Sequence, residues 1–272
     1  MKLSKNINLI LSVGRLILTI VLLVFIFNRI SFDNVLQVLY TANKNYLFLA
    51  LSLVLVQMIL KKYKRYLVGK ELHGKKIDPN SLTFMGKLSE LWTIVFFVLL
   101  GGLKLLTGYN SILIILAVAV ILLLLYQFRN FNNNITCFVP FKFLKAIVRS
   151  LTLVSWPLSN IILILSFLTM SVYFLQAYIL LSAFQPVAAS TILMVFPFIL
   201  LTNLVPVTIG SLGIREGAAI YLLSQFGIPA GAAVSVSLLL FLFDTVIPGV
   251  LGSLFFYSQK TNNLLTKVSS QL

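Results

Sequence analysis

Long apolar runs separated by short polar stretches dominate the chain, which is the pattern of a helical membrane protein. The longer runs lie at residues 7–27, 82–106, 109–128, 150–184 and 229–257, and a shorter run lies at 47–60. A helix needs roughly 20 apolar residues to cross the hydrocarbon core of a bilayer. We therefore predict an all-α fold, a polytopic transmembrane helix bundle with about six full spans. It should form a single integral membrane domain over residues 1–272.

One stretch interrupts this pattern with helix breakers and charges: NLVPVTIGSLGIREGAA, residues 203–219. Pro206 removes a backbone donor and disfavours helix at the residue before it, so the incoming helix should end near Asn203. Gly210 and Gly213 permit turns that other residues resist. A second helix can therefore begin near Gly213.

The distribution of basic residues predicts the orientation of the chain. Residues 61–76 contain seven Lys or Arg and one acid, and residues 129–149 contain four basic residues and no acid. Cytoplasmic loops of membrane proteins carry such an excess of positive charge. Together with Lys260 and Lys267, these loops predict a multi-pass protein of the cell membrane with cytoplasmic N- and C-termini.

This orientation limits what the interrupted region can do. Because the loop near Gln185 should face outward and the last run must return inward, residues 187–227 must leave and re-enter the same side. They make either two full crossings or two broken half-helices. The apolar run 218–226 is too short to cross alone. We therefore predict a Pro/Gly-broken hairpin near residues 190–227.

Composition and net charge indicate a lipid partner. Hydrophobic residues make up 60% of the 272 residues and charged residues 10%, so the net charge of +15 belongs to a membrane protein. Anionic headgroups are a better partner for it than nucleic acid, and we expect none of the latter. One cysteine, Cys137, and one histidine, His73, allow neither an internal disulfide nor a histidine-cysteine metal site, and we expect no cofactor.

Three ionisable residues near the break carry the candidate chemistry. A helix that begins near Gly213 presents unpaired amides and a positive dipole end, which favours an anion. Glu216 suits the first turn of that helix, whereas Arg215 needs an anionic partner. Asp244 lies inside the last apolar run, where an acid costs about 2.5 to 3.5 kcal/mol. We predict that Arg215 pairs with Asp244.

The predicted lipid- or phosphate-binding site consists of Asn203, Pro206, Gly210, Ser211, Gly213, Arg215, Glu216 and Asp244. The alternative is a structural clasp, in which the charges only hold the hairpin against the last helix. No set of residues indicates a catalytic or metal site. Elsewhere, Lys87 and Glu90 lie three apart and could pair with each other, and Pro248 should kink the last helix.

The C-terminal part of the chain resembles a known family. VPVTIGSLGIREGAAIYLLSQFGIPAGAAVSVSLLLFLFDTVIPGVLGSL is similar to the final third of the lysylphosphatidylglycerol synthetase transmembrane region, also called the flippase-like integral membrane family. The matching positions are Pro206, Gly210, Gly213, Arg215, Glu216, Gly217, Pro248 and Gly252. The match implies a shortened member without the aminoacyl-transferase domain. Phe241 stands where many members carry an arginine.

This resemblance implies a multi-span protein that handles lipids. In some members a modified phospholipid moves between leaflets, and others are associated with polyprenol-linked sugar pathways. We therefore expect a flippase-like protein that translocates or handles an anionic phospholipid or a polyprenyl-phosphate-linked glycan. The alternatives are a non-catalytic partner of a lipid synthase or glycosyltransferase, and a membrane-embedded enzyme of glycolipid or cell-envelope lipid assembly. An ion-coupled solute transporter ranks last, because only one half of the chain is broken.

Overall fold

The computed structural model describes residues 2–29, 32–71, 89–102, 156–204 and 208–253, and these are helical throughout apart from short connections. The helices are α1 (Lys2–Arg29), α2 (Phe32–Thr41), α3 (Lys44–Glu71), Ser89–Gly102, α8 (Trp156–Ser182), α9 (Ala189–Leu201), α10 (Ile214–Ser224) and α11 (Ala230–Phe241). The described part contains no strand. It therefore confirms the predicted all-α fold.

Three of these helices are long and apolar enough to cross a membrane: Lys44–Lys70, Pro157–Ser182 and Ala230–Ser253. Shorter apolar helices cover Val13–Ile26, Ser89–Gly102 and Ala189–Leu201. The predicted fourth span at 109–128 and the basic loop at 129–149 lie outside the described residues. The predicted number of full spans therefore remains a prediction.

The first half of the basic segment differs from the prediction, because it is helical rather than a loop. α3 continues without interruption from Lys44 to Glu71 and includes the basic residues up to Lys70. Lysine and arginine are good helix formers, and a long helix that leaves the bilayer can carry them on its final turns.

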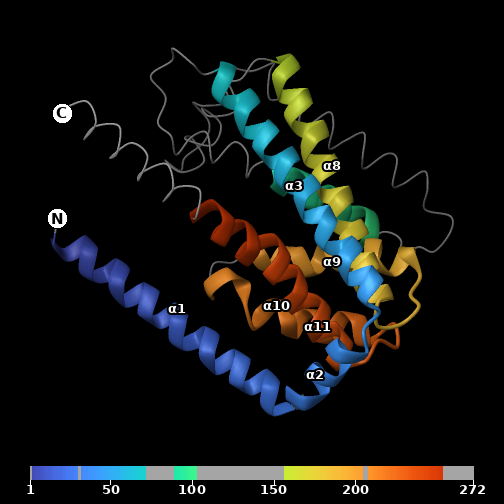
Figure 1. Ribbon diagram of the computed structural model, residues 1–272. Coiled ribbons are helices and arrows are strands. Elements are labelled where there is room, and N and C mark those ends of the chain that lie inside the picture. Colours follow the sequence, from blue (N-terminus) through green and yellow to red (C-terminus); the bar gives the residue numbers. More distant parts are fainter. Residues whose placement is uncertain (1, 30–31, 72–88, 103–155, 205–207, 254–272) are drawn as a thin grey trace, which may run out of the picture.

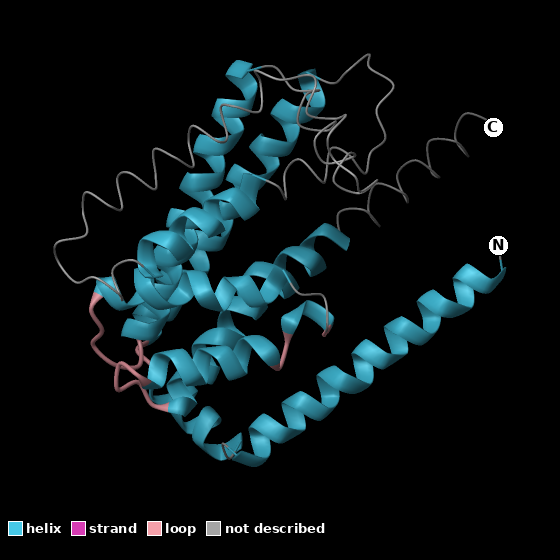
Figure 2. Ribbon diagram, turned by 180° about the vertical axis from the view of Figure 1, so that it is seen from behind, coloured by secondary structure: helices cyan, strands magenta, loops and turns pink. Residues whose placement is uncertain are grey.

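α3 and α8 lie side by side along most of their length, and α2 connects α1 to α3 (Figure 1). The backbone N–H of Asn43, between α2 and α3, donates to the carbonyl of Ala183 at the end of α8, 3.1 Å away. The short connections beside α2 and α3, after α8 and between α10 and α11 gather at one end of the molecule (Figure 2).

α9 and α10 form the broken hairpin that the sequence predicts. α9 starts at the end where the connections gather, the chain breaks after Leu201, and α10 runs back towards the same end (Figure 1). The hairpin packs against α8 and α11, and this contact fully buries Ile192, Phe196 and Leu223 of the hairpin and Val236 of α11. The break itself is partly enclosed, because Thr208, Ser211 and Gly213 are buried, whereas Asn203 and Gly210 are exposed.

Candidate functional site

The break between α9 and α10 consists of short turns whose backbone requires glycine. A 3-10 turn covers Thr202–Leu204 and another covers Ile209–Ser211. Gly210 has φ of 62° and Gly213 has φ of 88°, and side chains other than hydrogen resist such angles. Ser211 shares the positive φ, and its hydroxyl donates to the carbonyl of Thr202 at 3.1 Å. This hydrogen bond joins the two turns across the break.

Space as well as backbone angle excludes a side chain at Gly213. A Cβ atom there would lie 2.5 Å from Cβ of Leu22, because α1 packs directly against the break. A Cβ atom at Gly210 would similarly meet the Phe241 ring at 2.7 Å. The break is therefore held between α1 on one side and α11 on the other.

The N-terminus of α10 carries the chain's own carboxylate, so it is not as bare as predicted. The backbone N–H of Gly213 donates to Oε2 of Glu216 at 2.6 Å. A carboxylate in this position satisfies an unpaired amide and complements the positive end of the helix dipole. A headgroup that approached this helix end would meet an anion already in place.

Arg215 pairs with Glu216 and Ser237, so the predicted direct pair with Asp244 is wrong. Its Nη2 lies 2.9 Å from Oε1 of Glu216 and 2.7 Å from the carbonyl oxygen of Ser237, and its Nε donates to Oγ of Ser237 at 2.9 Å. The Ser237 hydroxyl also lies 2.9 Å from Oε1 of Glu216. The three residues form one hydrogen-bonded cluster.

This Arg215–Glu216–Ser237 cluster is almost inaccessible. Arg215 is 5% exposed, Glu216 is 0% exposed and Ser237 is 3% exposed. The guanidinium also lies over the Phe241 ring, 5.3 Å from its centroid, in cation–π contact. A buried ion pair persists only when additional hydrogen bonds satisfy its atoms, which Ser237 and Gly213 provide here.

Asp244 lies nearby but has no hydrogen-bonding partner among the described residues. Both of its carboxylate oxygens are buried, and no described residue donates a hydrogen bond to either. Lys61 on α3 and Arg215 on α10 are close enough to interact with it electrostatically. The hydroxyl of Thr208, within the break, is likewise buried without a partner in the described part of the chain.

A π turn at Leu242–Val246 explains why Asp244 is displaced from Arg215. Within this turn the N–H of Ile247 donates to the carbonyl of Leu242, five residues earlier. Pro248 has no N–H to donate to the carbonyl of Asp244, so the regular ladder cannot continue there. The irregularity that Pro248 was expected to cause therefore occurs as a widened turn around Asp244.

The predicted site residues thus divide into four groups. Ser211, Gly213, Arg215 and Glu216 lie together at the break, and Asp244 lies apart from Arg215 without a partner. Asn203 and Gly210 lie on the surface of the break, where both are exposed. Pro206 lies outside the described residues.

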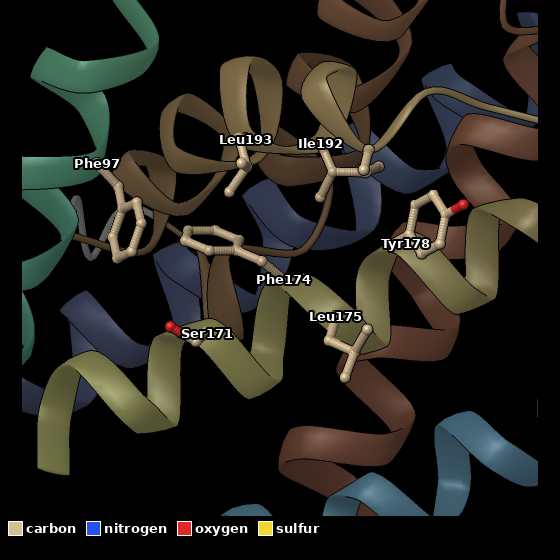
Figure 3. A pocket seen from close by; sticks show the side chains of 8 residues that line it. Phe97, Ser171, Phe174, Leu175, Tyr178, Ile192 and Leu193 are labelled. Carbon is tan, nitrogen blue, oxygen red and sulfur yellow. The ribbon is translucent and has the colours of Figure 1, made fainter. Parts of the chain in front are cut away.

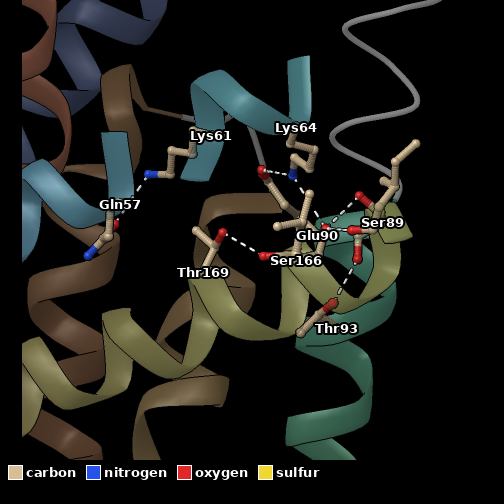
Figure 4. Close-up of polar contacts among 10 residues, drawn as sticks. Gln57, Lys61, Lys64, Ser89, Glu90, Thr93, Ser166 and Thr169 are labelled. Atoms are coloured by element: carbon tan, nitrogen blue, oxygen red, sulfur yellow. Dashed lines mark hydrogen bonds and ion pairs between the residues drawn. The ribbon is translucent and has the colours of Figure 1, made fainter. Parts of the chain in front are cut away.

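Sequence reasoning missed a chain of polar contacts between α3 and α8. Nε2 of Gln57 donates to Oε1 of Gln176 at 2.6 Å, and Nε2 of Gln176 donates to the carbonyl of Ala50. Nζ of Lys61 donates to Oε1 of Gln57 at 3.4 Å (Figure 4). Lys61 also interacts electrostatically with Asp244. The sequence signal for these contacts was the presence of two glutamines, each inside an apolar run, where a polar side chain needs a partner.

Glu90 pairs across helices, with Lys64. Nζ of Lys64 lies 2.6 Å from Oε1 of Glu90, and Ser166 on α8 lies beside both residues (Figure 4). Lys87, the predicted partner, lies outside the described residues. This Lys64–Glu90 pair joins α3, α8 and the helix Ser89–Gly102 near the basic end of α3.

An apolar groove of about 330 Å³ lies between α8, α9 and the helix Ser89–Gly102. It is lined by Phe97, Ser171, Phe174, Leu175, Tyr178, Ala189, Ile192 and Leu193 (Figure 3). Its lining suits a hydrocarbon chain better than a headgroup. Among the described residues, no group of three or more His, Cys, Asp or Glu side chains could hold a metal ion.

These features define a class: an all-α membrane protein whose bundle encloses a broken hairpin with buried, paired charges. The chain belongs to the family described as the lysylphosphatidylglycerol synthase TM region, whose model matches residues 81–252. That range includes the break, the Arg215–Glu216–Ser237 cluster and Asp244. No curated protein and no solved structure matches the chain.

Proposed function

We propose that this protein is flippase-like and moves an anionic phospholipid or a polyprenyl-phosphate-linked glycan past the break between α9 and α10. The observation that carries the proposal is an arginine buried at a helix break inside the bundle. Ionisable residues within membrane-embedded helices are costly and usually mark a pathway. Membership of a family named for the membrane region of a lipid synthase also supports a function in lipid handling.

The exposed part of the break gives the headgroup a polar path. Asn203 and Gly210 are exposed at its surface, and Arg215 is buried in the first turn of α10. An arginine has five N–H donors, and the hydrogen bonds of Arg215 to described residues use only Nε and Nη2. We assign the Nη1 donors to the headgroup phosphate, while the hydrocarbon chains remain in the bilayer.

The same proposal includes the predicted orientation. A single multi-pass domain with cytoplasmic termini would place the connection after α8 and the open end of the hairpin on the outer side. The break would then lie part-way across the bilayer, where a headgroup most needs polar contacts.

A structural clasp is the competing interpretation, and one observation favours it. Arg215 and Glu216 neutralise each other and leave few of their atoms unsatisfied. A protein of this kind would act as a non-catalytic partner of a lipid synthase or glycosyltransferase. Transport and clasp differ in whether a lipid changes leaflet.

Leaflet exchange in liposomes tests the proposal. The purified full chain is reconstituted with fluorescent phosphatidylglycerol or fluorescent polyprenyl phosphate, and exchange is followed by chemical quenching of the outer leaflet. We expect exchange above that of protein-free liposomes, reduced at least about tenfold in Arg215→Gln, since a charge-assisted hydrogen bond to phosphate contributes more than 1.4 kcal/mol. Arg65→Gln, at an exposed position on α3, is the matched control and should retain exchange.

A second variant keeps the test decisive if Arg215→Gln does not fold. Asn203 is exposed, so Asn203→Trp should fold and obstruct the surface of the break. Exchange no faster than in protein-free liposomes would refute transport. Co-purification of a synthase would then support the clasp, and chemical turnover of the headgroup would support an enzyme.

A further inference from the structure

Asp244 is a buried acid that the proposed headgroup path does not use. Its two carboxylate oxygens are buried, and no described residue donates to them. Lys61 of α3 and Arg215 of α10 lie close enough to Asp244 to interact with it electrostatically, and Tyr173 of α8 interacts in the same way with Asp244 and Glu216. Two opposing influences therefore act on it: burial without donors favours the neutral acid, and the two cations favour the carboxylate.

Four ionisable residues form one charged group around Asp244: Lys61, Arg215, Glu216 and Asp244 itself. The net charge of this group depends on whether Asp244 is ionised. Lys61 and Arg215 contribute two positive charges, and Glu216 and an ionised Asp244 contribute two negative charges. The group is therefore neutral while Asp244 is ionised and carries one positive charge when Asp244 is protonated. The Lys64–Glu90 pair is neutral by itself and does not alter this count.

A headgroup phosphate bound at Arg215 would upset the neutral state. With Asp244 ionised, the phosphate leaves one uncompensated negative charge inside the bundle, which is costly at low dielectric. With Asp244 protonated, the phosphate restores neutrality. Binding of an anion and protonation of Asp244 therefore favour each other, and the coupling is reciprocal.

We infer that Asp244 is a proton-binding site that takes up one proton when an anionic headgroup binds at Arg215. The proton comes from water, forms an O–H bond on the Asp244 carboxylate and returns to water when the headgroup leaves. This inference rests on the proposed function and adds to it a coupled ion.

A proton fits this site better than a metal ion. Hard cations such as Ca²⁺ require six or more oxygen ligands. The described part of the chain gathers no three His, Cys, Asp or Glu side chains that could supply them. A single carboxylate that lacks donors needs only one proton to become neutral and to gain a donor of its own.

Calorimetry measures the proton directly. Dioctanoyl phosphatidylglycerol is titrated into the full chain in neutral detergent, in two buffers of different ionisation enthalpy, over a series of pH values. We expect uptake of up to about one proton per lipid bound, with affinity rising up to about tenfold for each pH unit of acidification. Replacing sodium by choline should leave both quantities unchanged, whereas a sodium site would lose affinity.

Two variants locate the proton. Asp244→Asn keeps the shape of the side chain but cannot ionise, so it should bind lipid without proton uptake and without dependence on pH. Asp33→Asn removes an exposed acid of α2 and should behave like the unmodified protein. If Asp244→Asn does not fold, the pH dependence of the unmodified protein still decides whether a proton is bound.

The outcomes separate this inference from the proposed function. Lipid binding without proton uptake, or with the same uptake in Asp244→Asn, overturns the role of Asp244 and leaves the headgroup site intact. Absence of phosphatidylglycerol and polyprenyl-phosphate binding at every pH overturns the proposed site, and the coupled proton with it.

Discussion

Two regions of the molecule bury charge, and they satisfy it to different degrees. Between α3, α8 and the helix Ser89–Gly102, Lys64 is 3% exposed and pairs with Glu90, whose side chain is 32% exposed. At the broken hairpin, the side chains of Arg215 and Glu216 are 6% and 1% exposed. The second pair is thus the more deeply enclosed.

The difference appears in the atoms that remain without partners. Among the described residues, the buried side-chain atoms that lack a hydrogen bond are Oγ1 of Thr208 and both carboxylate oxygens of Asp244. All three belong to the break or to the helix that packs on it. Buried polar groups in folded proteins are nearly always paired, so exceptions call for a functional reason.

This comparison separates a structural contact from a candidate site. The Lys64–Glu90 region has the pairing expected of a contact that holds helices together. The hairpin region combines a satisfied ion pair with unsatisfied polar atoms beside it. Substitutions made in matched pairs, one in each region, test the distinction.

The largest effect is expected from Glu216→Ala, with Glu90→Ala as its matched control. The first change leaves Arg215 buried without its anion and removes the acceptor for the Gly213 N–H, which should cost about 3–5 kcal/mol of unfolding free energy. Glu90 is partly exposed, so its removal should cost less, about 1–3 kcal/mol. Denaturant unfolding in detergent micelles measures both. An equal or larger loss for Glu90→Ala would contradict the comparison.

The next effect concerns the backbone of the break. Gly213→Ala forces a side chain into φ of 88° and against Leu22, at an expected cost of about 2–4 kcal/mol. Gly217, four residues later in α10, has open space around its Cβ position, so Gly217→Ala should stabilise the helix by about 0.5–1 kcal/mol. Thermal unfolding checks whether the melting temperature falls in Gly213→Ala and rises in Gly217→Ala. Similar shifts for both would mean that the break does not require its observed geometry.

The location of the break follows from local signals in the sequence. α9 ends at Leu201 and a 3-10 turn covers Thr202–Leu204, close to the end predicted near Asn203. α10 begins at Ile214, one residue after the predicted start near Gly213. Proline and glycine act on the backbone next to them, so their effects can be recognised without knowledge of the fold.

The partner of Arg215 could not be predicted in the same way. Ser237 and Asp244 lie seven residues apart and would share a face of a regular helix. The π turn at Leu242–Val246 adds a residue to the turn and rotates the later part of the helix by about 100°. Glu216, adjacent in sequence, was assigned to the helix dipole alone. One of its carboxylate oxygens accepts from Gly213 and the other from Arg215, and this double role depends on side-chain geometry that the sequence pattern does not encode.

Contacts between distant segments were equally beyond the sequence. Lys64 and Glu90 are separated by 26 positions, and Gln57 and Gln176 by 119. Gln57, Glu90 and Gln176 lie inside apolar runs, where a polar side chain needs a polar partner, whereas Lys64 lies in the basic segment and gives no such signal. The identity of the partner depends on how the helices pack, and hydropathy does not encode that.

The smallest difference in stability is expected between variants of two buried serines. Each serine is hydrogen-bonded within one of the two ion-paired regions. Ser237→Ala removes the acceptor of Arg215 Nε and a donor to Glu216, so it should cost about 1–3 kcal/mol. Ser166→Ala removes a hydrogen bond to Ser89 at 2.8 Å and a long contact of 3.4 Å to Lys64, but Lys64 keeps Glu90 at 2.6 Å and no charge loses its partner, so about 0.5–1.5 kcal/mol is expected. Denaturant unfolding compares the two losses.

Leaflet exchange in liposomes separates the two serines further. Ser237 holds the arginine to which we assign the headgroup, so Ser237→Ala should slow exchange even under conditions in which the protein remains folded. Ser166 lies in the structural contact, and its removal should leave exchange unchanged. Slower exchange in Ser166→Ala, with no change in Ser237→Ala, would move the functional site from the broken hairpin to the α3–α8 contact.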